Sequence, residues 1–192
     1  MDINHLLLNH DYYTEILNEL DNKPDLVFAS SFNVYAAINE VGVNYAEFGD
    51  KYINGIYRIF NKLTELKIKT KLLIGLPGYR PCNINCQDCK EKFVGLCDRV
   101  LRTVEHWPDF EWKVTANSHF KTFGFVYGKK IISIIGSSNL TGSNADEANL
   151  VVDGKAATDI FRLFVGRYNK AFTLDQDFID DHIRESLSNT KY

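Results

Sequence analysis

Residues 117–152 read NSHFKTFGFVYGKKIISIIGSSNLTGSNADEANLVV, and this stretch decides the fold. Two runs rich in β-branched and aromatic residues, Phe120–Tyr127 and Ile131–Ile135, are separated by Gly128-Lys129-Lys130. This pattern predicts a β-hairpin with glycine in its turn. After a polar loop, Ala148–Val152 predicts a further strand. The hairpin would return the chain to the end of the sheet at which it started.

Outside this stretch the chain alternates short apolar runs with longer amphipathic ones, and it contains no internal repeat. Strands interleaved with helices, together with a hairpin, predict an α/β fold in which helices flank a mixed β-sheet. The further strands are expected at Leu26–Ala29, Thr70–Leu76 and Phe110–Thr115, and the helices at Asp11–Leu20, Tyr45–Leu66, Cys97–His106, Ala156–Phe172 and Phe178–Leu187.

Length and composition limit the classes to which the protein can belong. The 192 residues fit one domain, residues 1–192. With 45% hydrophobic and 24% charged residues, wholesale disorder is excluded. No apolar run approaches the roughly 18–20 residues that span a bilayer, and the N-terminus does not resemble a signal peptide, so we expect a cytoplasmic protein without a membrane partner. The net charge of −3 argues against nucleic-acid binding by bulk charge but allows a local basic groove.

Four polar side chains in the quoted stretch form a group suited to phosphate chemistry. In an extended segment, residues i and i+2 share a face, so His119 and Lys121 are expected to point the same way. The hairpin would bring the loop that carries Ser137 and Asn139 to the same end of the sheet. An ammonium supplies charge, a hydroxyl and an amide supply neutral donors, and an imidazole can attack or move a proton.

These residues resemble the signature of the phospholipase D superfamily, which is HxK, a variable gap and then GSxN. The match is residue by residue at His119, Lys121, Gly136, Ser137 and Asn139. The resemblance implies a phospholipase D-like fold and a phosphodiester hydrolase, and the branches that the chain resembles are the bacterial endonucleases and the phospholipase D-type restriction endonucleases.

Two further positions bear on the resemblance. Glu147 resembles the acidic residue that follows the GSxN loop in the bacterial nuclease branch, where it would orient the imidazole and favour its protonated form. A solvated loop carboxylate is the alternative reading of this residue. The family usually has an aspartate five residues after the lysine, and this chain has Val126 there. Valine cannot form the side-chain hydrogen bond that the aspartate forms in the family.

The resemblance also implies a mechanism and an assembly. One histidine attacks phosphorus and forms a phosphohistidine, and a second histidine protonates the leaving oxygen and then activates water, without a metal. None of the other histidines has a lysine two residues on, so the chain carries one motif copy; they are His5, His10, His106 and His182. A single-motif chain would complete its site across the two-fold axis of a homodimer.

The four cysteines lie within sixteen residues, spaced Cys82-x3-Cys86-x2-Cys89-x7-Cys97. Clustered thiols in a chain without an export signal favour metal binding over disulfides. We therefore expect a small four-cysteine insertion at residues 80–98, a polar loop that holds a structural zinc ion. The first three cysteines also match the CxxxCxxC motif of radical SAM enzymes, but that reading needs a barrel-type scaffold, and Cys97 offers a fourth ligand. An ordinary iron–sulfur cluster remains the alternative metal group, and four unliganded cysteines are the alternative without a metal.

The sequence thus predicts an endonuclease that cleaves DNA, with nucleic acid and a second copy of the chain as partners. Two alternatives remain open: a phospholipase D that hydrolyses phospholipids, and a non-catalytic nucleic-acid-binding module of the same fold. The cations around the cysteines either contact phosphates or form a solvated charged surface; they are Arg80, Lys90, Lys92, Arg99 and Arg102.

Overall fold

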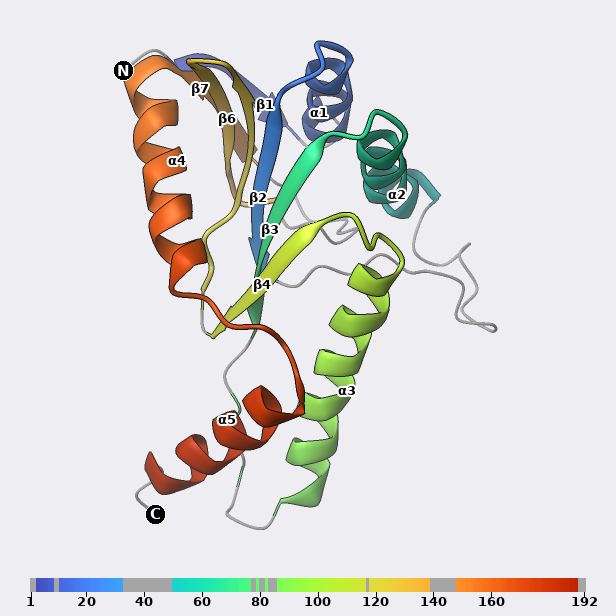
Figure 1. Ribbon diagram of the computed structural model, residues 1–192, viewed down its shortest axis with the longest axis vertical. Coiled ribbons are helices and arrows are strands. Elements are labelled where there is room, and N and C mark those ends of the chain that lie inside the picture. The colour runs from blue at the N-terminus through green and yellow to red at the C-terminus, as the bar shows by residue number, and fades with distance from the viewer. Residues whose placement is uncertain are drawn as a thin grey trace.

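Seven strands form one mixed sheet in the order β1-β7-β6-β5-β2-β3-β4 (Figure 1). The computed structural model describes residues 3–8, 11–32, 50–76, 79, 82, 86–116, 118–138 and 148–189. The strands are β1 (Ile3–Leu8), β2 (Leu26–Phe32), β3 (Lys69–Leu76), β4 (Glu111–Ala116), β5 (Thr122–Tyr127), β6 (Lys130–Gly136) and β7 (Ala148–Asp153). The helices are α1 (Asp11–Asp21), α2 (Asp50–Glu65), α3 (Gln87–Glu105), α4 (Gly154–Asn169) and α5 (Gln176–Asn189).

The strand directions give the sheet two chemically different ends. Strands β2, β3 and β4 are parallel to one another, whereas β5 is antiparallel to β2 and to β6, and β7 is antiparallel to β6. The carboxyl ends of β2, β3, β4 and β6 therefore meet the amino ends of β5 and β7 at one end of the sheet. This is the end that parallel α/β sheets commonly use for binding sites.

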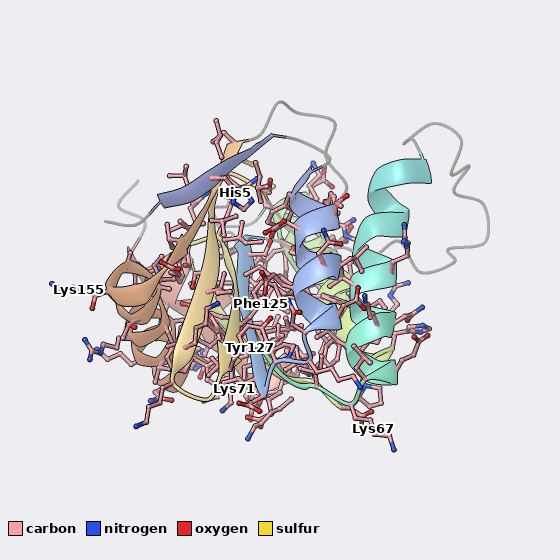
Figure 2. The ribbon with its side chains drawn as sticks, turned by 90° about the horizontal axis from the view of Figure 1, so that it is seen from above. His5, Lys67, Lys71, Phe125, Tyr127 and Lys155 are labelled. Carbon is pink, nitrogen blue, oxygen red and sulfur yellow. The ribbon has the colours of Figure 1, made fainter. Side chains whose placement is uncertain are left out.

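Helices cover both faces of the sheet, as Figure 2 shows in a view along the strands. Helix α4 packs on one face, against β6, β7 and β2, and α1 and α2 pack against each other on the opposite face. The larger hydrophobic cluster lies on the α1/α2 side, and a smaller one centred on Phe28, Leu73, Phe164 and Tyr168 lies under α4. The sheet therefore lies between two helical layers.

Helices α3 and α5 reach beyond the end of the sheet where β2, β3 and β4 terminate (Figure 1). They are joined by a stack of rings: His182 of α5 lies 5.5 Å, centroid to centroid, from both Phe93 of α3 and Phe178. After α4 the chain forms an antiparallel bridge between Phe172 and Val114, with hydrogen bonds of 2.9 and 2.8 Å. This bridge covers the free edge of β4.

The predicted α/β class with a mixed sheet flanked by helices is confirmed, and each predicted strand has an observed counterpart. Strand β1 was not predicted, because six residues at an edge gave too short an apolar signal. Helix α3 begins at Gln87, ten residues before the predicted start, so most of the expected cysteine loop is helical. Among the described residues, no helix is long and apolar enough to cross a membrane.

Candidate active site

The segment His119-Phe120-Lys121 lies directly before β5, at the sheet end described above. The hydroxyl of Ser30 on β2 donates a hydrogen bond of 2.8 Å to the carbonyl oxygen of Phe120, which ties the segment to the neighbouring strand. The Phe120 ring packs against the small cluster under α4. The His119 side chain is exposed and Lys121 is half-buried, with Lys121 Nζ 3.4 Å from the His119 carbonyl oxygen. Phe120 therefore holds the segment against the fold, whereas the side chains of His119 and Lys121 lie at the surface.

The second half of the motif follows β6 and starts with a glycine that the structure requires. Gly136 is paired with Asn149 at the start of β7. A Cβ atom added at Gly136 would lie 2.7 Å from the Asn149 Cα atom and closer still to the carbonyl oxygen of Ala148 and to Asn149 Oδ1. Any side chain at this position would therefore push β7 away from β6.

Side-chain hydrogen bonds hold the next two residues against β7. The hydroxyl of Ser137 accepts a hydrogen bond of 3.1 Å from the backbone N–H of Ala148. The amide of Asn149, which is 2% exposed, donates a 2.7 Å hydrogen bond to the hydroxyl of Ser138 and accepts a 3.4 Å one from the Ser138 N–H. Ser137 is exposed, and its hydroxyl donates a long hydrogen bond of 3.5 Å to the carbonyl oxygen of Ala148.

The strand register brings the two halves of the motif to the same end of the sheet. Thr122, which follows Lys121, is paired with Ile135, which precedes Gly136. His119, Lys121 and Ser137 therefore extend beyond the same end of adjacent strands. Asn139 and Glu147, the remaining predicted catalytic residues, lie outside the described residues.

Helix α4 contributes a residue to this region that sequence reasoning missed. Arg167 donates a 3.0 Å hydrogen bond from Nη1 to the hydroxyl of Ser118, and its guanidinium carbon lies 5.1 Å from the centroid of the Phe120 ring. The two contacts place an arginine against the residues on either side of His119. No local pattern marks Arg167, since it lies 49 residues from Ser118 in the chain.

Three of the four cysteines gather before and at the start of α3. The sulfur atoms of Cys82, Cys86 and Cys89 all lie within 4.8 Å of one another, and the Cys86 and Cys89 sulfurs are 3.1 Å apart. Hydrogen bonds with the sulfurs of Cys82 and Cys89 lower the pKa of Cys86. Hydrogen bonds with the sulfurs of Cys86 and Cys89 raise the pKa of Cys82 to about 11. Because metals bind thiolates, this set could hold a metal ion. Of the cations expected around the cysteines, Arg80 lies outside the described residues.

Cys97 is not part of this group, which corrects the predicted site of four cysteines. It lies eight residues after Cys89 on the same helix, a rise of about 12 Å at 1.5 Å per residue, too far for a shared tetrahedral ion. Its side chain is fully buried in the larger core cluster, and burial raises the pKa of its thiol to about 11. Cys97 is therefore a small core residue, which the spacing of cysteines alone could not reveal.

The chain matches no family model and no curated protein. Among solved structures it is similar to a polyphosphate kinase from Porphyromonas gingivalis, with a TM-score of 0.51 and 12% identity over 83% of this chain and 25% of that one. It also aligns with TrmBL2, described as an archaeal chromatin protein with a novel mode of DNA binding, at a TM-score of 0.45 and 10% identity over 90% of this chain and 54% of that one. This chain thus spans about a quarter of the length of the polyphosphate kinase and about half of the length of TrmBL2.

The likeness to the polyphosphate kinase concerns the fold alone, because the identity is low. That enzyme has a phospholipase D-like fold, and the seven-stranded mixed sheet of this chain is of the same kind. The fold expected from the HxK and GSxN motifs is therefore confirmed, whereas the reaction has to be argued from the site.

Proposed function

We propose that this chain is a phosphodiester hydrolase, an endonuclease that cleaves DNA through a phosphohistidine on His119. The observation that carries the proposal is the placement of His119, Lys121 and Ser137 at one end of adjacent strands in a phospholipase D-like sheet. The Asn139 amide would complete the donors around the phosphate. An exposed imidazole at the same end of the sheet as an ammonium and a hydroxyl would provide a nucleophile together with groups that stabilise phosphoryl oxygens.

The proposed reaction has two steps. First, an imidazole nitrogen of His119 forms a bond to phosphorus as the bond from phosphorus to one ester oxygen breaks. The leaving oxygen takes a proton from a second imidazolium. Second, water loses a proton to that now neutral imidazole and attacks phosphorus, which breaks the phosphorus–nitrogen bond and releases the phosphomonoester. Lys121 compensates charge on the non-bridging oxygens throughout, so no metal is required for the transfer.

The second imidazole would come from the same residue of another copy of the chain. No other histidine belongs to an HxK motif, and a two-fold axis would place two His119 side chains on opposite sides of one phosphate. Glu147 would orient each imidazole. We therefore propose a homodimer with one shared site.

Plasmid and oligonucleotide cleavage in the presence of EDTA tests the proposal. Wild type should cut, whereas His119→Ala should lose cleavage and keep its fold, because an exposed polar side chain contributes little to stability. His5→Ala is the matched control, since His5 is also exposed but lies on the edge strand β1. Residual activity of His119→Ala above a few per cent would refute the nucleophile, and vesicle hydrolysis without DNA cleavage would refute the substrate.

The cysteine group is proposed to hold zinc. Cys82, Cys86 and Cys89 supply three thiolates, and the fourth position of a tetrahedral ion would take a ligand from outside this group. The ion would link Cys82 and Cys86, which precede α3, to Cys89 in its first turn. This role would be structural and separate from the phosphoryl transfer. Metal analysis of the purified protein tests this, and iron with visible absorbance would favour the iron–sulfur alternative instead.

A further inference from the structure

A surface groove of about 480 Å³ lies beside the candidate site, between the end of β4 and the last turns of α4. Among the described residues its walls carry three cations, two hydroxyl groups and no carboxylate; these polar residues are Thr115, Ser118, Arg162, Arg167 and Lys170. Arg162, Arg167 and Lys170 are exposed. In a chain with a net charge of −3, this is a local concentration of positive charge.

Two of the cations have no acidic partner within the described part of the chain. Arg162 pairs with Asp159 at 3.3 Å, but Arg167 is held only by the Ser118 hydroxyl and the Phe120 ring, and Lys170 forms no ion pair there. Lys113, two residues before Thr115 on β4, extends the positive charge; its ammonium lies 5.2 Å from the centroid of the Tyr168 ring. Unpaired cations next to hydroxyl donors are suited to phosphate oxygens.

The groove joins the candidate site through one peptide unit. Ser118 lines the groove and directly precedes His119, so their Cα atoms are about 3.8 Å apart. Ser118 and Phe120 contact α4, whereas the His119 side chain is exposed. A single phosphodiester at His119 would not extend into the groove, but a polymer of phosphodiesters crossing the end of the sheet would.

From this arrangement we propose that the groove lined by Arg167 and Lys170 binds the phosphate backbone of a polynucleotide next to the scissile phosphodiester. This inference rests on the proposed function and deepens it, because it gives the protein a second site that binds a phosphate of the same substrate. Each phosphate contact in a duplex contributes about 0.9 to the slope of log K against log salt. Two such contacts should therefore strengthen duplex binding roughly 60-fold at about 0.1 M salt.

The test compares Arg167→Gln/Lys170→Gln with Lys129→Gln/Lys130→Gln. Both pairs remove two positive charges, but Lys129 and Lys130 are exposed at the β5–β6 turn, at the other end of the sheet. Binding of a fluorescent duplex of about 20 base pairs, long enough for several phosphate contacts, is measured by anisotropy across a salt series. The binding assays use a His119→Ala background that prevents cleavage. Hydrolysis of bis(4-nitrophenyl) phosphate, a single phosphodiester, is measured with His119 intact.

The groove variant should weaken duplex binding roughly 60-fold at about 0.1 M salt and reduce the salt slope by about 1.8. Lys170→Gln, which leaves the Arg167 contacts to Ser118 and Phe120 in place, should keep kcat/KM for the single phosphodiester within about twofold of wild type, and the control pair should leave the salt slope unchanged. Lys170→Gln alone should cost about eightfold and reduce the slope by about 0.9. Since the contacts to Ser118 and Phe120 come from Arg167, this variant separates binding from any displacement of His119.

Equal salt slopes for the groove and control variants would overturn the inference, even if the wild type hydrolyses both substrates. Groove-dependent binding to phosphatidylglycerol vesicles without duplex binding would also overturn it. If the wild type hydrolyses neither substrate but duplex binding still depends on Arg167 and Lys170, the phosphate-backbone site stands and the proposed hydrolase fails.

Discussion

Replacement of Gly136 by alanine should destabilise the protein and disable the site together. Gly136 does not have the positive φ angle seen at Gly128 and Gly154, so alanine is compatible with its backbone conformation. The obstacle is the β7 backbone, since the new methyl group would lie 2.7 Å from the Asn149 Cα atom and closer to the Ala148 carbonyl oxygen. Backbone in a paired strand cannot rotate away as a side chain can. We therefore expect a loss of about 3 kcal/mol in the free energy of unfolding, in the upper part of the range for overpacking.

Urea denaturation and thermal melting measure this effect. For a chain of this size, a loss of about 3 kcal/mol lowers the Tm by about 6–12 °C. Gly95→Ala is the matched control, because Gly95 lies within α3 and an added Cβ would meet nothing within 4 Å. This control should stabilise the protein by up to about 1 kcal/mol. A Gly136→Ala protein with wild-type stability would show that β6 and β7 are not held this closely and would refute the account of the motif glycine.

Further predictions concern the metal, the assembly and pH. Cys86→Ser should lose the bound metal, whereas Cys97→Ala should keep it and lose about 1–2 kcal/mol of stability through its core position, as metal analysis and denaturation will show. In mixtures of equal amounts of wild-type and His119→Ala subunits, activity should fall to about a quarter, since each shared site needs two histidines; a fall to one half would contradict the dimer. Hydrogen bonds from Lys71 and then Lys69 lower the pKa of Glu111, so its stabilisation is present at neutral pH and is lost as the pH falls through that lowered pKa. Glu111→Gln should therefore be less stable than wild type at pH 7, by less than about 1 kcal/mol because the carboxylate and its lysine partners are partly exposed, and the difference should vanish below the lowered pKa of Glu111.

The hairpin and the placement of the motif could be predicted because local patterns carry them. Alternation, a turn glycine and the spacing of His119, Lys121 and Ser137 are all properties of neighbouring residues. The pairing of Thr122 with Ile135 then follows from a two-residue turn. The order of the remaining strands depends on contacts between distant segments, and β1 at the sheet edge shows how little signal a short edge strand gives.

The cysteine segment shows the opposite case. Spacing alone made four thiols equivalent, but Cys89 and Cys97 lie on one continuous helix whose rise separates them. The buried positions Phe93, Cys97, Val100 and Val104 form the inner side of that helix, so its hydrophobic pattern places Cys97 in the core. The periodicity of α3 was therefore a better guide to Cys97 than the count of cysteines was.

Two layers of the fold contribute to the region around His119: the sheet and helix α4. Ser118 and Phe120 contact Arg167 of α4, whereas the intervening His119 side chain is exposed. The chemistry proposed at His119 would depend on the sheet and on the residues that follow β6, whereas the positive charge next to it comes from α4. On the proposed function, substitutions on the exposed face of α4 would change which polyanion binds without changing the residues proposed to attack phosphorus. If the proposed groove site is correct, substrate preference depends on α4, and replacing Lys170 alone should raise KM for long substrates while kcat is retained.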